Sequence, residues 1–193
     1  MKNLYKLTLI ALLSPVSALA LSESNNVFFQ QPLGGVFDSD MPHQDFSNEL
    51  PSGDGTITYL YKPKEELAIP FRDYAAYLTP ISKKVAIIEA SKLEDNLESC
   101  TASLRYFTRE YADKTLTKFK SLDQLSGLGY TVNQTANPNI EIRYSPEDQL
   151  SLQYGCTPSS IEKGKFAFIV SFSDGKLKSI AEKERDKILA TKN

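Results

Sequence analysis

One amphipathic stripe constrains this chain most, because it predicts a long helix and places one of only two cysteines on the apolar side of that helix. Apolar side chains recur at alternating spacings of four and three, which puts them on one face at 3.6 residues per turn: Leu93, Leu97, Cys100, Leu104, Phe107 and Tyr111. Ser91 is placed as the N-cap, and Glu94 three residues later completes a capping box. The stripe therefore predicts a helix from about Lys92 to Ala112.

Two apolar runs precede this helix, at residues 74–78 and 85–89. They are rich in aromatic and β-branched side chains, and the turn between them contains Pro80, whose ring fixes φ. The two runs therefore predict a hairpin. Both strands are apolar on both faces, which favours a central position in the sheet.

The C-terminal third alternates between apolar and polar residues, as half-buried strands do. The alternation covers residues 140–144, 150–156 and 166–172, and the first two runs are joined by a turn of four polar residues. A further β-prone run occupies residues 56–61, and Asp174 is placed to cap a final helix. We therefore expect an α+β fold: a mostly antiparallel sheet of about five to six strands, with the central amphipathic helix on one face and a C-terminal helix.

The first twenty residues read as a secretory signal peptide. Lys2 and Lys6 precede a short apolar run at residues 7–13, and Ala18 and Ala20 stand at the −3 and −1 positions of a cleavage site. The apolar run is too short to cross a bilayer, so we expect cleavage after Ala20 rather than a membrane span. This segment predicts a periplasmic or secreted protein.

We divide the chain into a signal peptide at 1–20, an irregular N-terminal arm at 21–55 and a single α+β domain at 56–193. The arm is interrupted repeatedly by proline and glycine, and aromatic residues such as Phe28 and Phe29 are expected to hold it to the domain. Removal of two lysines with the signal peptide moves the formal charge from −2 to about −4. This mild acidity, without a basic run, argues against nucleic acid as a partner.

The two cysteines are expected to form a disulfide. Cys100 lies on the apolar stripe of the helix, and Cys156 is in phase with the buried side of the last predicted hairpin. An even number of cysteines in an exported chain favours a bridge over free thiols. The predicted Cys100–Cys156 bridge therefore fastens the central helix to the C-terminal sheet.

The sequence predicts no catalytic residues, no metal site and no cofactor. His43 is the only histidine, which excludes multi-histidine metal sites, and its irregular surroundings favour a solvated loop residue over a catalytic or metal-ligating one. Ser160 and Lys163 match the S-x-x-K pattern of serine acyl-enzymes, but they lie in a predicted loop and the chain is too short for that fold. Two oxidised cysteines supply no thiolate nucleophile.

We therefore expect an exported, non-enzymatic binding protein of the bacterial periplasm or extracellular space. Its partner would be an unidentified protein of the envelope or the surroundings, and the sequence does not indicate the binding residues. Two alternatives stay open: a secreted hydrolase that works through carboxylates, and a secreted effector or inhibitor that acts on another cell. A cleft with two convergent carboxyl groups, one of them with a raised pKa, would favour the hydrolase.

Overall fold

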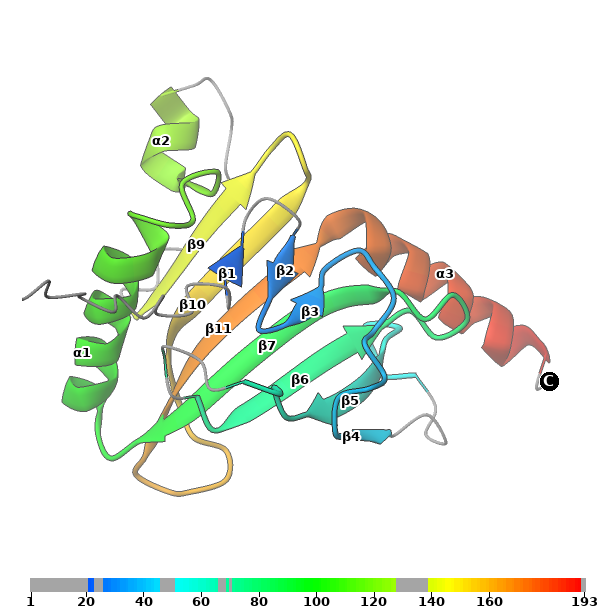
Figure 1. The fold of residues 1–193 in the computed structure, drawn as a ribbon, viewed down its shortest axis with the longest axis horizontal. Helices are drawn as coiled ribbons and strands as arrows, with labels where there is room; N and C mark the ends of the chain where they lie inside the picture. The colour runs from blue at the N-terminus through cyan, green and yellow to red at the C-terminus, as the bar shows by residue number, and fades with distance from the viewer. Residues whose placement is uncertain are drawn as a thin grey trace, which may run out of the picture.

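The computed structural model describes residues 21–22, 26–45, 51–65, 69, 71–127 and 139–191. The signal peptide predicted at residues 1–20 lies outside this part of the chain. The described elements form a large antiparallel sheet with helices packed on it and a small three-stranded sheet beside it (Figure 1). The predicted α+β class with a C-terminal helix is confirmed.

The large sheet has eight strands in the order β4-β5-β6-β7-β11-β10-β9-β8. Its two halves come from separate parts of the chain and meet where β7 pairs with β11. The bounds of the strands are β4 His43–Asp45, β5 Ile57–Tyr61, β6 Asp73–Leu78, β7 Val85–Glu94, β8 Lys120–Ser121, β9 Ile140–Ser145, β10 Leu150–Pro158 and β11 Phe166–Asp174. The predicted hairpins β6–β7 and β9–β10 are confirmed, and β6 and β7 are central strands as expected.

The predicted count of five to six strands was too low. The prediction missed β4 and β8, which contain three and two residues. A run of two or three residues cannot display an alternation of period two, so the sequence carries no signal for them. Both lie at the edges of the sheet, where a short strand limits pairing with another chain.

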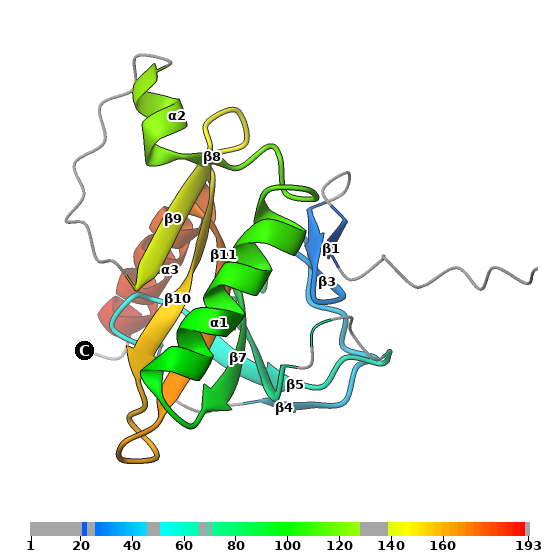
Figure 2. The ribbon, with the colours of Figure 1, turned by 90° about the vertical axis from the view of Figure 1, so that its left-hand side faces the viewer.

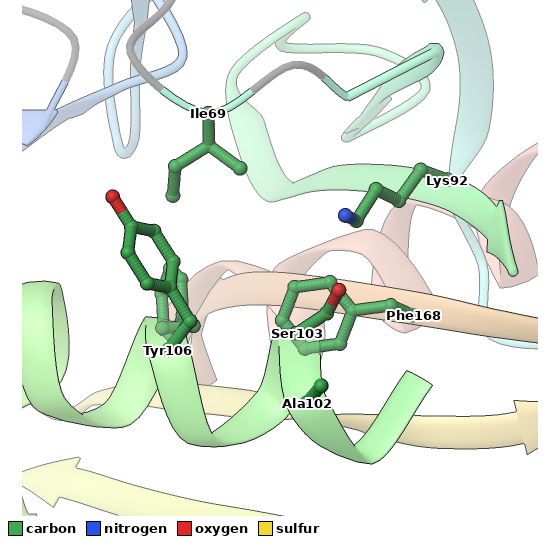
Figure 3. Close-up of a pocket in the computed structure, with 7 residues that line it drawn as sticks. Ile69, Lys92, Ala102, Ser103, Tyr106 and Phe168 are labelled. Carbon is green, nitrogen blue, oxygen red and sulfur yellow. The ribbon is translucent and has the colours of Figure 1, made fainter. Parts of the chain in front are cut away.

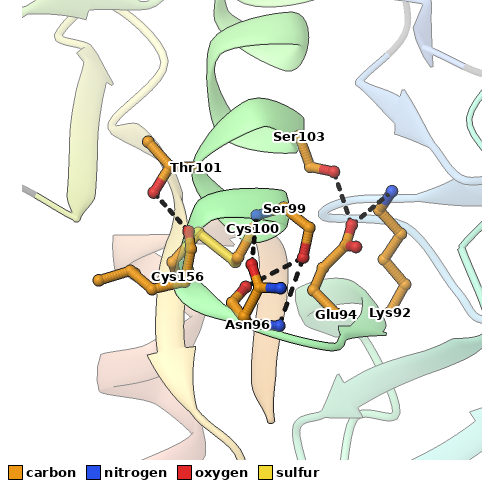
Figure 4. The surroundings of a disulfide bond; sticks show 9 residues. Lys92, Glu94, Asn96, Ser99, Cys100, Thr101, Ser103 and Cys156 are labelled. Carbon is orange, nitrogen blue, oxygen red and sulfur yellow. Dashed lines mark hydrogen bonds and ion pairs between the residues drawn. A yellow bond between two sulfur atoms is a disulfide. The ribbon is translucent and has the colours of Figure 1, made fainter.

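The central helix begins later than predicted. The helix α1 spans Leu97–Phe107, and its N-cap is Asn96 rather than Ser91. The side chain of Asn96 accepts a hydrogen bond from the backbone of Ser99, and the Ser99 hydroxyl accepts one from the backbone of Asn96 (Figure 4). Residues 91–94 instead extend β7 along β11, because pairing in the sheet outweighs a local capping signal.

The predicted disulfide between Cys100 and Cys156 is present (Figure 4). The two Cα atoms lie 5.9 Å apart, within the range that a bridge spans. Cys100 is fully buried on α1 and Cys156 is 3% exposed on β10. The bridge therefore holds α1 against one face of the sheet, as expected.

The C-terminal end of α1 widens into a π-helix at Thr108–Ala112. Arg143 of β9, only 6% exposed, donates hydrogen bonds to the carbonyl of Ala112 and to the carboxylates of Asp113 and Glu141. A cation at this end satisfies a helix carbonyl that has no partner within the helix. Arg143 therefore anchors the end of the helix to the sheet as the disulfide anchors its beginning.

The N-terminal segment 21–55 contains the small sheet, formed by β1 Leu21–Ser22, β2 Val27–Phe28 and β3 Gln31–Pro32. Phe28 is fully buried and Phe29 is 1% exposed. The Phe28 ring stacks on Phe172 of β11, with the ring centroids 3.9 Å apart. The small sheet lies beside α1 on the same face of the large sheet (Figure 1), and Phe28 and Phe29 form part of the hydrophobic core.

The helix α3, Gly175–Thr191, packs on the face opposite to α1 (Figure 2). The carboxylate of Asp174 accepts hydrogen bonds from the backbone N–H groups of Lys176 and Leu177, which confirms the predicted cap. The side chains of Leu177 and Ala181 are buried beneath the helix. The rest of α3 is mostly charged and exposed.

A buried carboxylate fixes α3 to the turn between β6 and β7. Glu184 is 9% exposed and accepts hydrogen bonds from the backbone N–H groups of Ile81 and Ser82, at 2.7 and 3.1 Å. Burial alone would raise the pKa of Glu184, but the hydrogen bonds from Ser82 and Ile81 outweigh it and leave the pKa below its ordinary value.

A Glu184→Gln variant is expected to lose about 1 kcal/mol at neutral pH, because the amide keeps one acceptor but loses the charge that strengthens these hydrogen bonds. A folded-state pKa below the ordinary value stabilises the fold above that ordinary pKa, and the contribution is lost as the pH falls through the folded-state pKa. Urea unfolding from pH 7 down to pH 3 measures the effect. The gap between wild type and variant should close in acid, and Glu182→Gln, at an exposed position of α3, should show no gap. A gap of constant size at every pH would contradict the assignment.

Candidate functional site

A small hollow opens beside α1, with a volume of about 270 Å³ (Figure 3). Its walls come from the helix, from the central strands β7 and β11, and from one residue of the loop before β6. Most of the lining is apolar or aromatic, and the lining residues are Ile69, Lys92, Ala102, Ser103, Tyr106, Phe107 and Phe168.

The helix presents its side chains to this hollow because both of its ends are fixed. The cap at Asn96 sets where the first turn begins, and the bridge at Cys100 sets which side faces the sheet. Ala102 and Tyr106 are then one turn apart on the edge of the helix that borders β7. Phe107 and Phe168, each 1% exposed, belong to the core and form the floor of the hollow.

The polar groups at the rim of the hollow pair with one another. The Lys92 ammonium lies 2.8 Å from the Glu94 carboxylate, and the Ser103 hydroxyl donates a 2.6 Å hydrogen bond to the same carboxylate (Figure 4). Burial alone would raise the pKa of Glu94, but hydrogen bonds from Lys92 and Ser103 and the charge of Lys92 outweigh it and lower this pKa. A carboxylate with a lowered pKa is a poor general base near neutral pH, so the group suits positioning rather than proton transfer.

Tyr106 is the exposed aromatic residue of the site. Half of its surface is accessible, and its ring stands off α1 toward Ile69 (Figure 3). Tyr111 contacts its edge, with the ring centroids 6.2 Å apart, and Tyr111 in turn stacks on buried Phe107. An aromatic ring supported from behind and exposed in front is a typical anchor for a partner, because tyrosine has an apolar body and a polar tip.

A second hollow, of about 150 Å³, lies on the other face of the sheet and contains Glu89. Burial raises the pKa of this carboxyl group. Among the described residues that line this hollow, Glu89 is the sole carboxyl group. A hydrolase of the expected kind needs two convergent carboxyl groups, so the lining does not supply its reactive pair.

The candidate residues considered from the sequence, His43, Ser160 and Lys163, do not line either hollow. His43 is exposed on β4, where its ring stacks on Tyr59 and its Nδ1 lies 2.7 Å from the carbonyl of Met41. Ser160 and Lys163 are exposed in the loop between β10 and β11. Within the described ranges, no three side chains of the kinds that ligate metals come together.

Tyr106 and Lys92 were not predicted as site residues from the sequence. Lys92 was assigned to the predicted helix, whereas it lies on β7 and faces the hollow from the sheet. Tyr106 lies outside the apolar stripe of α1, among charged neighbours. A large aromatic residue on the polar side of an amphipathic helix was the available signal, because exposed aromatic surface is unfavourable unless a partner covers it.

The chain matches no protein-family model, no curated protein and no solved structure. Of the helices that the structure describes, none combines the length and the apolar character needed to cross a membrane. The site is therefore interpreted from its own geometry.

Proposed function

We propose that this chain is an exported, non-enzymatic binding protein that takes an apolar side chain of a protein partner into the hollow beside α1. The observation that carries the proposal is the half-exposed ring of Tyr106 next to an apolar hollow. The predicted signal peptide supports an exported protein. The disulfide agrees with it, because such bonds persist in the periplasm and outside the cell.

The size and the charge of the hollow favour a partner's side chain over a separate small molecule. Pockets for small molecules usually hold about 300–1,000 Å³, whereas 270 Å³ suits one large apolar side chain. The charges of Lys92 and Glu94 already satisfy each other, so they do not select a charged ligand. Around an apolar centre, such a group forms the polar rim that is common in protein interfaces.

The alternatives differ in how far the structure supports them. Neither of the two hollows lined by described residues supplies the carboxyl pair that the hydrolase needs, so we do not propose that activity. An effector or inhibitor that acts on another cell would differ from our proposal only in where the partner resides. The same hollow would bind the partner in both cases.

Ala102→Arg is expected to weaken partner binding at least about tenfold, because the long side chain fills the hollow from its rim. Ala102 is exposed and helical, and arginine is nearly as good a helix former as alanine, so the melting temperature should not change. Ala190→Arg makes the same substitution at an exposed position of α3, on the opposite face of the sheet, and is the matched control.

The measurement uses a photo-crosslinking amino acid at position 106 in the protein produced in its native compartment. We expect one discrete adduct, which disappears with Ala102→Arg and persists with Ala190→Arg. The same crosslinker at the exposed Lys183 of α3 controls for random capture. An adduct that survives Ala102→Arg, or that also forms from position 183, would overturn the proposal.

A further inference from the structure

The second hollow combines one carboxyl group with neutral polar groups and apolar walls. It lies on the face of the sheet that carries α3 and is formed by residues of β7, β9, β10 and β11. Its polar lining is Glu89, Gln153, Ser171 and Thr157, and isoleucine side chains at 140 and 169 supply apolar surface.

The register of the sheet places these polar groups in one row. Glu89 of β7 pairs with Ser171 of β11, and Ser171 pairs with Gln153 of β10. Paired residues of neighbouring strands point to the same face, and adjacent strands are about 4.8 Å apart. A carboxylate, a hydroxyl and an amide therefore lie side by side and can contact one small group together.

Within the part of the chain that the structure describes, Glu89 has no counter-charge. Among the described residues none forms an ion pair or a hydrogen bond with its side chain, and burial is the cause of its raised pKa. A half-buried carboxyl group without a partner lowers stability, so packing alone does not explain a glutamate in the middle of the sheet. Residues that lower stability in this way are often kept for binding.

Tyr77 is a titratable neighbour of Glu89. Tyr77 of β6 lies on the same face, and its pKa is raised to about 12 by burial and then by the charges of Glu89 and Asp54. Asp54 lies in the loop before β5. Tyr77 with this raised pKa is neutral near pH 7, and Lys178 of α3 offsets the charge of Asp54, so the Glu89 carboxylate itself is the charge that favours a positively charged ligand.

We propose that this hollow binds a primary alkylammonium group, with the nitrogen at Glu89 and the alkyl chain along Ile140 and Ile169. An ammonium group has three donors, which match the acceptors of the row: the Glu89 carboxylate, the Ser171 hydroxyl and the Gln153 amide oxygen. A volume of about 150 Å³ suits one short alkylamine. The ligand is either a lysine side chain of a polypeptide or a free amine, and the site is independent of the hollow beside α1.

The test titrates the protein with n-butylamine and follows the backbone amide resonances of Glu89, Gln153 and Ser171. We expect saturation in the millimolar range with n-butylamine and none with 1-butanol, which has a similar shape without the charge. An N-acetyl-lysine amide that binds more tightly than n-butylamine would indicate a polypeptide source, and a tighter diamine would indicate a free polyamine. Equal binding of the alcohol, or no saturation with any amine, would overturn the proposal.

The Glu89→Gln variant separates a binding role from a structural one. We expect at least a tenfold loss of affinity for n-butylamine together with a higher melting temperature, because the uncompensated charge is gone. Glu147→Gln makes the same change in the exposed turn between β9 and β10 and should alter neither quantity. Unchanged amine binding in Glu89→Gln would overturn the proposal. A fall in its melting temperature would do the same, because it would show that Glu89 is paired within the protein.

Discussion

Phe28→Ala is expected to destabilise the protein by about 3–5 kcal/mol, a large part of the roughly 5–15 kcal/mol that holds a typical domain together. Phe28 is fully buried, stacks on Phe172 and contacts the edge of Phe119 at 6.2 Å between ring centroids. Truncation would leave a cavity between the N-terminal segment and the sheet. Urea unfolding followed by circular dichroism measures the loss.

Val36→Ala is the matched control, because Val36 belongs to the same segment but is 68% exposed. Its effect should stay within about 0.5 kcal/mol. A Phe28→Ala variant that loses less than about 1 kcal/mol would show that the N-terminal segment is an appendage of the domain. The boundary drawn at residue 56 stays a prediction, and the same comparison tests it.

The sequence predicted the long elements well because their signals are repeated many times. Six strands and the C-terminal helix lie where alternation and capping placed them. The predicted start of α1 was wrong because Leu93 is four residues from Leu97, which is also the spacing of a helical stripe. The last residues of a strand therefore matched the helical pattern by chance. Only the pairing of β7 with β11, which is distant in sequence, decides that Leu93 belongs to a strand.

The hairpin of β2 and β3 had no local signal either. Its turn is formed by Phe29 and Gln30, which have positive φ values of 49° and 64°. Two-residue turns of this kind normally contain asparagine and glycine, because other side chains are strained there. Burial of the Phe29 ring against Phe71, Tyr74 and Phe172 offsets that strain, and such tertiary packing cannot be read from the segment itself.

The two hollows were not predictable because each one is assembled by strand pairing and helix docking. The hollow beside α1 joins Ile69, Lys92 and Phe168, which belong to three separate parts of the chain. In the sequence nothing distinguishes Glu89 from the other acidic residues. Only the register of the strands shows that it lies in one row with Ser171 and Gln153. The disulfide was predictable because two independent periodicities pointed both cysteines inward.

Replacing both cysteines, Cys100→Ala with Cys156→Ala, is expected to destabilise the protein by about 4 kcal/mol. The bridge joins residues 56 positions apart, and closing so long a loop restricts the unfolded chain strongly. Buried alanines also lose the packing of the sulfur atoms. Urea unfolding of the double variant, compared with oxidised wild type, measures the sum of the two effects.

Wild type reduced with dithiothreitol separates these two effects, because it loses the bridge and keeps both sulfur atoms. We expect the reduced protein to lose most of the stability that the double variant loses, since the constraint on the unfolded chain is the larger contribution. Thiol titration of the denatured, unreduced protein should find no free sulfhydryl. Two free thiols, or a double variant within about 1 kcal/mol of wild type, would contradict the view that the bridge fastens α1 to β10. The geometry of the hollow beside Tyr106 depends on that attachment, so the double variant should also lose the crosslink from position 106 wherever it still folds.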